Sequence, residues 1–284
     1  MDGIDIEHGM PGRYARDPVL GIIERRSSTR KFADAPVTDE QRAAVLRAAT
    51  RAPSAGAMMM YSIIDVRDPA TLGELAVLAD DQPFIARAPW ALVFVVDYAK
   101  WIDLFERAGC FEPGFAEAAG RTERRAPHLG DLAVAAQDAV IAAQTAVLAA
   151  EAVGLGSCYI GDVVENAEDV ARLLELPAHT LPLSMLVLGV PAKERPATPH
   201  PVANIVMRER YRRADEALLD EQIREMDALF RPRAEAPGER VRDIYVRKHT
   251  SDFMAEMDRS MRRWLANWTG EDPILGDGEP LHRL

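Results

Sequence analysis

The 284-residue sequence contains few of the residues that stabilise small secreted domains or hold metal ions. Its two cysteines, Cys110 and Cys158, are too few for a disulfide framework and do not have the spacing of metal ligands. The six histidines are scattered and form no pair at ligand spacing on a helix, so we expect no metal site. The chain must therefore be stabilised by a hydrophobic core, and at this length such a core can enclose a bulky cofactor.

The sequence also lacks an excess of positive charge and an uninterrupted apolar run. Its formal net charge is -11, and an acidic surface repels phosphates and anionic lipids, so neither nucleic acid nor a membrane is an expected partner. Residues 1–12 lack the apolar stretch of a signal peptide. The most apolar run, residues 132–153, contains Gln137, Asp138 and Glu151, which indicates a buried helix of a soluble protein. We therefore expect a cytoplasmic protein.

Helix and strand patterns alternate through the first part of the chain. Short apolar and β-branched segments predict strands at residues 61–66, 90–97, 157–160 and 183–190. Helical patterns cover residues 18–30, 38–50, 71–79, 129–153 and 167–174. Thr38 and Gln41 form a capping box at the start of the second helix. This alternation predicts a three-layer α/β or α+β core.

The pattern changes near residue 208, where the sequence becomes helical, strongly charged and amphipathic. We therefore divide the chain into a core domain, residues 1–211, and a helical C-terminal extension, residues 212–284. The extension cannot bury its aromatic face alone, so we expect it to pack on its own core or on a partner subunit. Its expected anchors are Tyr245, Phe253, Trp264 and Trp268.

Four cations and three hydroxyl groups lie within residues 25–31, where the first helix is expected to give way to a basic turn. Arginine offers two parallel donors and serine a short hydroxyl donor, so this cluster can bind a phosphate. A solvated helix end, whose cations complement the helix dipole, explains the same residues equally well. Composition alone leaves both interpretations open.

Three segments together resemble the flavin-binding motifs of the nitroreductase superfamily. The first runs from Arg26 to Phe32 with the pattern RxSxRxF, the second is Ala52–Gly56 with the strand that follows it, and the third is Gly154–Gly161. They occur in the family's order, and the resemblance covers residues 18–211. It implies an α+β fold with a mixed central β-sheet flanked by helices, an intertwined homodimer, and FMN as the cofactor.

The resemblance also implies roles for individual residues. It makes Arg26, Ser27 and Ser28 the contacts of the FMN phosphate and ribityl chain. It places Arg30 toward N1 and O2 of the flavin, where a fixed cation stabilises the negative charge of the reduced form. The other implied flavin contacts are Gln82 at the pyrimidine edge, Pro53 and Ser54 from the other subunit with their neighbours Ala55, Gly56 and Ala57, and Tyr159, Ile160 and Gly161 near N5.

Several of these residues have a plain structural alternative. Pro53 and Ser54 can simply end a helix, and Gly161 can turn the chain after a strand. Gln82 can satisfy a loop instead of a ligand.

The sequence departs from the family pattern in two places. Ala57 stands where many relatives have asparagine, and the neighbouring Met58–Met60 can either line a ligand pocket or fill the core. Relatives commonly carry a basic residue near Ala197–His200 that grips the phosphate. The candidates for that role here are Lys193, Arg195 and His200.

Together the residues and the resemblance predict an FMN-dependent oxidoreductase. NAD(P)H would give a hydride to flavin N5 and leave, and a small aromatic, quinone or nitro-type acceptor would then bind the same face in a ping-pong cycle. The flavin carries the chemistry, so we predict no catalytic side chain. The sequence has neither a GxSxG nucleophile elbow nor a P-loop. Two alternatives stay open: specialised flavin chemistry (flavin fragmentation, dehalogenation or dehydrogenation) and non-catalytic FMN binding.

Overall fold

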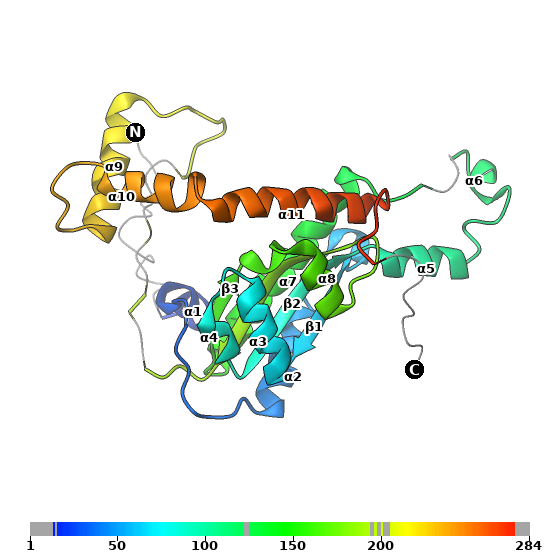
Figure 1. Cartoon of the computed structure of the whole chain (residues 1–284), viewed down its shortest axis with the longest axis horizontal. Coiled ribbons are helices and arrows are strands. Elements are labelled where there is room, and N and C mark those ends of the chain that lie inside the picture. The colour runs from blue at the N-terminus through cyan, green and yellow to red at the C-terminus, as the bar shows by residue number, and fades with distance from the viewer. Residues whose placement is uncertain are drawn as a thin grey trace. The chain divides into compact units, whose positions relative to one another are not determined.

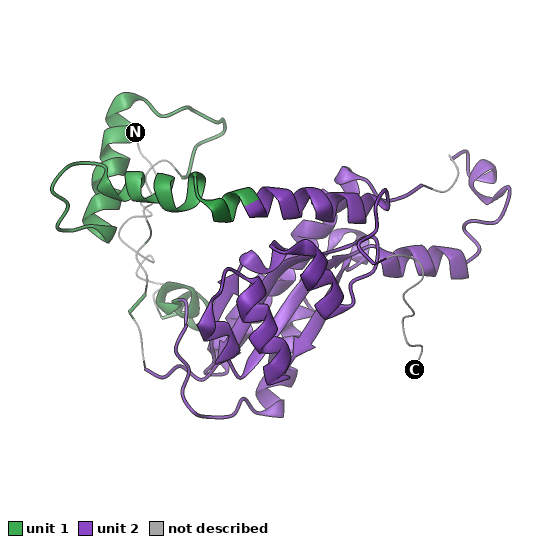
Figure 2. Cartoon of the chain, in the orientation of Figure 1, with its two compact units in different colours: residues 1–27, 195–255 green, residues 28–194, 256–284 purple. Residues whose placement is uncertain are grey.

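The computed structural model describes residues 14, 16–121, 125–193, 196–197, 200 and 205–275. Contacts between residues divide the chain into two compact units (Figure 2). Unit 1 consists of Met1–Ser27 and Arg195–Ala255, and unit 2 consists of Ser28–Glu194 and Glu256–Leu284. The domain boundary predicted between residues 211 and 212 falls inside unit 1 and stays a prediction.

Four antiparallel strands form the sheet of unit 2, in the order β1-β2-β4-β3 (Figure 1). They are β1 (Tyr61–Val66), β2 (Trp90–Asp97), β3 (Gly156–Ile160) and β4 (Thr180–Gly189). All four strands expected from the sequence are confirmed. Within the described part of the chain, the one parallel pairing is an isolated bridge between Ser28 and Ser157, so the mixture of strand directions is confined to that bridge.

Strand β2 shows why the sheet is buried on both faces. Ala91 and Val93 belong to the hydrophobic cluster on one face, and Leu92 and Phe94 belong to the cluster on the other. Successive side chains of a strand point to opposite faces, so a continuous apolar sequence needs cover on both sides.

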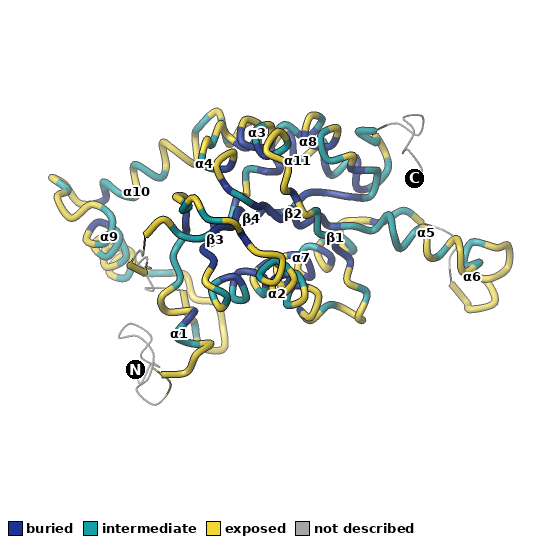
Figure 3. Tube along the Cα trace, turned by 90° about the horizontal axis from the view of Figure 1, so that it is seen from below, coloured by how far each residue is buried: buried dark blue, intermediate teal, exposed yellow. Residues whose placement is uncertain are grey.

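Helices cover the two faces of the sheet, as the buried inner surfaces in Figure 3 show. On one face lie α3 (Pro69–Leu78), α8 (Ala167–Leu174) and the end of α11 (Asp252–Thr269), and on the other lie α2 (Asp39–Ala49) and α7 (Leu129–Ala152). Unit 2 also contains α4 (Pro83–Ala86), α5 (Ala99–Arg107), α6 (Phe115–Ala118), η1 (Ala55–Ala57) and η2 (Asp162–Val164). Unit 1 contains α1 (Pro18–Arg25), α9 (Glu216–Phe230), α10 (Glu239–Ile244) and η3 (Tyr245–His249). This arrangement confirms the α+β class.

Helix α1 is shorter than the sequence predicts. The expected helix over residues 18–30 ends at Arg25, because Arg26 adopts the extended angles φ -58° and ψ 135°. The next residues of the basic segment are extended, which lets them pair with a strand. The capping box of α2 is confirmed: Thr38 accepts from the Gln41 N–H, and the Gln41 side chain accepts from the Thr38 N–H.

Helix α7 is the long alanine-rich helix expected from the sequence. Its length and composition would also suit a membrane span, but one of its faces packs within unit 2. The buried residues are Ala135, Asp138, Ala139, Ala142, Ala143, Ala146, Val147 and Ala150. The remaining surface exposes Val134, Val140 and Ile141.

Two of the four expected aromatic anchors fix the end of α11 to the core of unit 2. Trp264 and Trp268 are completely buried, and their ring N–H groups donate to the carbonyls of Val164 at 2.9 Å and His128 at 3.1 Å. Tyr245, in unit 1, is instead 56% exposed, so its ring is not a buried anchor of the C-terminal extension.

Candidate cofactor site

The first predicted segment lies along β3 at the edge of the sheet. Ser28 pairs with Ser157, and the Thr29 N–H donates to the Ser157 carbonyl at 2.8 Å. A Cβ atom at Gly156 would collide with the Thr29 side chain. The glycine of the third motif is therefore needed so that the first motif can lie against it.

Gln82 lies beside the end of the third motif. It directly precedes α4, and its amide nitrogen donates to the Asp162 carboxylate at 2.6 Å and to the Ala79 carbonyl at 2.8 Å. Asp162 follows Gly161 in the chain, so two segments that are far apart in sequence meet here.

Arg30 joins the same region through α4. Its guanidinium lies 5.8 Å from the centre of the Phe84 ring, two residues after Gln82. The Arg30 side chain is exposed, so its charge is available to a ligand. The structure thus brings together three predicted segments, residues 28–32, 82–84 and 157–162, within unit 2.

The hydrogen bonds of Gln82 decide which amide atom faces outward. Asp162 and Ala79 both offer acceptors, so the amide nitrogen must face them. The Gln82 carbonyl oxygen is then left to accept a hydrogen bond from a ligand.

Further acidic residues, Asp80 and Glu165, lie near Asp162. Glu165 is 4% exposed, and burial, with the charges of Asp80 and Asp162 next in importance, raises the pKa of Glu165 to about 7. The cause is the cost of a carboxylate charge away from water and near other carboxylates.

Two side chains of the third motif differ in their burial. Ile160 is 2% exposed, so its contact with a cofactor would come from the backbone. Tyr159 is half-buried, and its hydroxyl donates to the Gln144 side chain of α7 at 3.3 Å. A Cβ added at Gly161 would meet no atom within 4 Å, so there is open space beside that residue.

The second predicted segment is an exposed loop before β1. Pro53, Ala55, Gly56 and Ala57 are exposed, and Gly56 and Ala57 have positive φ angles of 57° and 56°. Because the strand order is β1-β2-β4-β3, this loop and the third motif belong to strands at opposite edges of the sheet. Three strand spacings amount to about 14 Å. Within one chain, the sheet therefore keeps the second segment apart from the third.

The methionine run packs mainly in the core, and a role of it in a ligand pocket stays a prediction. Met60 is buried in the core at 4% exposure, and Met58 packs against the same cluster. Met59 is 45% exposed and has a positive φ of 48°. The loop therefore offers one methionine to the surface.

The remaining predicted phosphate contacts are Arg26, Ser27 and the late basic candidates. Arg26 and Ser27 follow α1 in unit 1, where the Arg26 N–H donates to the Ile22 carbonyl at 3.0 Å. Among the late basic candidates, Arg195 lies outside the described residues. The role of Lys193 or His200 stays a prediction.

The model of the nitroreductase family matches residues 23–190, which span all three motifs. This chain belongs to the nitroreductase family. The oxygen-insensitive NADPH nitroreductase of Salmonella typhimurium is 35% identical to it over 212 residues, which are 73% of this chain and 82% of that protein. An FMN reductase (NADPH) of Bacillus subtilis is 34% identical over 173 residues, 61% of this chain and 66% of the relative.

Solved structures of nitroreductase relatives share the fold. Bacillus megaterium NfrA1 superimposes with a TM-score of 0.73 at 27% identity, over 89% of this chain and 99% of the other chain. The NADPH:FMN oxidoreductase from Vibrio harveyi, solved in complex with NAD+, gives a TM-score of 0.67 at 26% identity, over 86% and 98% of the two chains.

The groups of this chain that converge at the β3 edge fit FMN. Arg30 supplies an exposed cation, Gln82 a hydrogen-bond acceptor, and Gly161 open space beside the backbone. A flavin pyrimidine ring has an N–H donor and carbonyl oxygens, so an acceptor and a cation match it.

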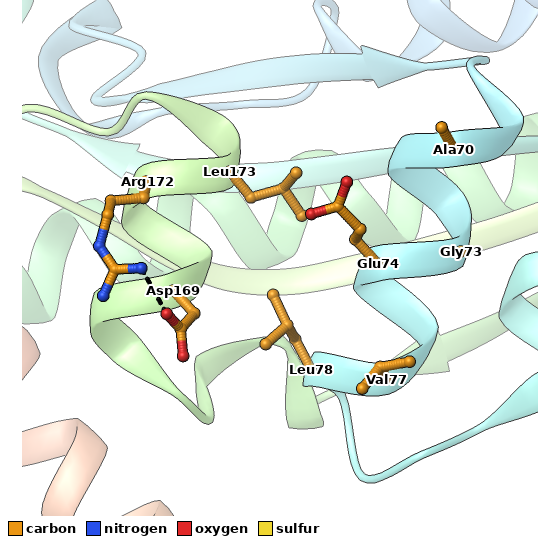
Figure 4. Close-up of a pocket in the computed structure, with 8 residues that line it drawn as sticks. All are labelled: Ala70, Gly73, Glu74, Val77, Leu78, Asp169, Arg172 and Leu173. Atoms are coloured by element: carbon orange, nitrogen blue, oxygen red, sulfur yellow. Dashed lines mark hydrogen bonds and ion pairs between the residues drawn. The ribbon is translucent and has the colours of Figure 1, made fainter.

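A groove of about 750 Å³ between α3 and α8 fits a cofactor less well (Figure 4). Its wall includes Val77, Leu78 and Leu173, and its polar pair, Asp169 and Arg172, is engaged in an ion pair of its own. A binding site needs polar groups that converge on the ligand. None of the predicted cofactor contacts lines this groove.

Sequence reasoning missed the acidic residues that organise the site. Asp162 fixes Gln82, and Asp138 of α7 bonds to the loop before β1. Asp138 carried a signal, because a carboxylate inside an otherwise apolar helix needs partners. No local pattern marks Asp162.

Proposed function

We propose that this nitroreductase-family protein is an FMN-dependent oxidoreductase that takes electrons from NAD(P)H and passes them to a small, flat acceptor such as a nitroaromatic or a quinone. The observation that carries the proposal is the convergence of Arg30, Gln82 and Gly161 at one edge of the sheet. The names of the Salmonella and Bacillus relatives support NADPH and FMN as the redox partners.

Each group of the chain has a defined task in this proposal. Arg30 stabilises negative charge at the pyrimidine end, and Gln82 accepts from the ring N–H. Arg26, Ser27 and Ser28 hold the phosphate against the acidic charge of the whole protein. FMN, when bound, supplies the hydride chemistry for both NAD(P)H and the acceptor in a ping-pong cycle. No side chain is needed as a general acid or base.

We also propose that the protein acts as a cytoplasmic homodimer. The loop with Pro53–Ala57 and the third motif lie at opposite edges of the sheet, so a second copy can supply that loop to the site. The exposed face of α7, with Val134, Val140 and Ile141, offers an apolar surface for such a partner.

The proposal is tested with purified protein reconstituted with FMN. Anaerobic NADPH should bleach the flavin absorbance, and an added quinone should restore it. Arg30→Ala should weaken FMN binding roughly tenfold, about 1.4 kcal/mol, because the fixed cation is lost. Arg172→Ala removes an exposed arginine of α8 that lies in the groove and should leave binding unchanged.

Three outcomes separate the candidates. FMN binding with bleaching and reoxidation supports the reductase. Tight FMN binding without bleaching by NADH or NADPH would favour a flavin-binding protein. Equal FMN affinity of the wild type and Arg30→Ala would contradict the assigned site.

A further inference from the structure

Asp138 is a buried carboxylate in the middle of α7 and is 2% exposed. A charge is costly in such a position unless hydrogen bonds compensate for the lost water. Both of its oxygens are used on backbone N–H groups of the loop that precedes β1.

These two bonds grip the loop at both ends. Asp138 Oδ1 accepts from the Ala55 N–H at 2.9 Å, and Oδ2 accepts from the Met60 N–H at 3.3 Å. Between them, the Met59 N–H donates to the Ser54 hydroxyl at 3.2 Å. The segment from Ser54 to Met60 is therefore tied to α7 and to itself.

The loop needs such restraint because its backbone is unfavourable. Ala57 and Met59 have positive φ angles of 56° and 48°, and neither is glycine. A non-glycine residue in this region is strained and persists only when its surroundings hold it. Asp138 supplies the acceptors that offset this cost.

Other contacts anchor the same loop on its far side. The Trp101 ring N–H donates to the Met58 carbonyl at 3.0 Å, and the Lys100 ammonium donates to the Tyr61 carbonyl. Lys100 and Trp101 belong to the first turn of α5, so the start of α5 and the loop before β1 are joined by hydrogen bonds within unit 2.

We propose that Asp138 is a positioning residue that holds the Ser54–Met60 loop, with its left-handed residues Ala57 and Met59, and thereby presents Pro53–Ala57 to the flavin of a partner subunit. This inference rests on the proposed FMN function and dimer. It assigns Asp138 no contact with the flavin: the residue acts only through the loop.

The first test compares two carboxylates of the same helix. Asp138→Asn replaces one acceptor oxygen by an NH2 group that faces a backbone N–H. Asp131→Asn is the control on the same helix, because Asp131 accepts from the His128 N–H at 2.9 Å at the start of α7 and pairs with Arg125, but does not contact the loop before β1. FMN affinity, measured by fluorescence titration, should fall at least tenfold in Asp138→Asn and less than twofold in Asp131→Asn.

Thermal unfolding of the FMN-free proteins separates positioning from general destabilisation. Asp138→Asn must lose one of its two bonds to the backbone, and Asp131→Asn loses its ion pair with Arg125. Both should therefore melt below the wild type, but only Asp138→Asn should lose FMN affinity. If the wild type binds FMN and Asp138→Asn binds it with equal affinity, the inference is overturned. A wild type that binds no FMN would instead overturn the proposed function.

A second measurement needs no variant that could fail to fold. In the FMN-free wild type, hydrogen exchange should be slow at the amides of Ala55 and Met60. It should be faster at Gly56, because the amides of Ala55 and Met60 donate to a buried carboxylate. Exchange at Ala55 and Met60 as fast as at Gly56 would contradict the restraint.

The action across subunits is tested with a mixed dimer. One chain carries Arg30→Ala and the other carries Asp138→Asn, and the two are separated from parent dimers by different tags. If Asp138 serves the partner's flavin, both changes fall in one site, and half of the sites should bind FMN with wild-type affinity. The absence of any wild-type site would show that Asp138 serves its own chain and would overturn the proposal.

Discussion

At the scale of single residues, the site depends on which side-chain atoms face each other. Gln82 was identifiable as a candidate from the sequence, but its orientation was not. The orientation follows from Asp162, which is 80 residues away along the chain and bonds to the amide nitrogen at 2.6 Å. No local pattern encodes such a pair, because it arises only when β3 and α4 come together.

Replacing Asp162 should therefore weaken cofactor binding through Gln82. In Asp162→Ala the Gln82 amide keeps only its bond to the Ala79 carbonyl, so its orientation is held less firmly and the hydrogen bond to a flavin N–H is weakened. A net hydrogen bond contributes about 1 kcal/mol, so FMN affinity should fall roughly fivefold in a fluorescence titration. Asp169→Ala, on the exposed surface of α8, is the matched control. Unchanged or tighter FMN binding by Asp162→Ala would contradict this role.

Glu165 should make stability depend on pH. Its folded pKa of about 7 lies above the ordinary value of 4.5, so the folded protein keeps a proton that the unfolded chain releases. Stability should fall as pH rises from about 4.5 to about 7 and then level off, by at most about 3 kcal/mol from this group. Glu165→Gln should remove this slope in urea unfolding measured at pH 5 and pH 8. A wild type and a variant with the same pH profile would exclude the raised pKa.

At the scale of elements, the sequence was most informative where one segment decides its own structure. The continuous apolar run of β2, the capping box of α2 and the alanine pattern of α7 each act over a few residues. The expected helix over residues 18–30 was wrong beyond Arg25. There, pairing of Ser28 with Ser157 in unit 2 needs extended backbone, and tertiary contact outweighs helical propensity.

Gly156 should prove necessary for the contact between the first and third motifs. In Gly156→Ala the new methyl group collides with Thr29, which should destabilise the protein by about 1–3 kcal/mol in urea unfolding. Thr29→Ala in the same chain should recover part of the loss, since it removes the atoms that collide.

Gly73→Ala provides the control for this pair. A Cβ at Gly73 in α3 meets no atom within 4 Å, so that substitution should be neutral or stabilising by up to about 1 kcal/mol. A Gly156→Ala protein as stable as Gly73→Ala would show that the two motifs are not in tight contact.

At the scale of the whole molecule, two predicted parts of the cofactor site lie at opposite edges of the sheet. The hydrogen-bonded register of the strands fixes the positions of β1 and β3 in the sheet. The loop before β1 therefore cannot approach the segments at β3 by a shift of the strands. The proposed second copy of the chain would supply the loop to the site, and the exposed apolar residues of α7 offer a surface for it.

The dimer should depend on the exposed face of α7. The wild type should have twice the mass of the 31.3 kDa chain in light scattering at micromolar concentration. Ile141→Asp, which places a charge on that face at a position 39% exposed, should give monomers and lose FMN. Val77→Asp changes an exposed apolar residue of α3 and should leave the mass unchanged. A wild type that is monomeric would contradict the dimer.

The sequence by itself determined the strands, most of the helices and the three motifs that mark the family, because apolar alternation, caps and short motifs act within a few residues. Only the tertiary structure decided that Gln82 meets Asp162, that Asp138 ties down the loop before β1, and that this loop lies at the far edge of the sheet from Gly161. The bonds of Asp138 span about eighty residues of chain, and the packing of α7 against the sheet is what brings their ends together.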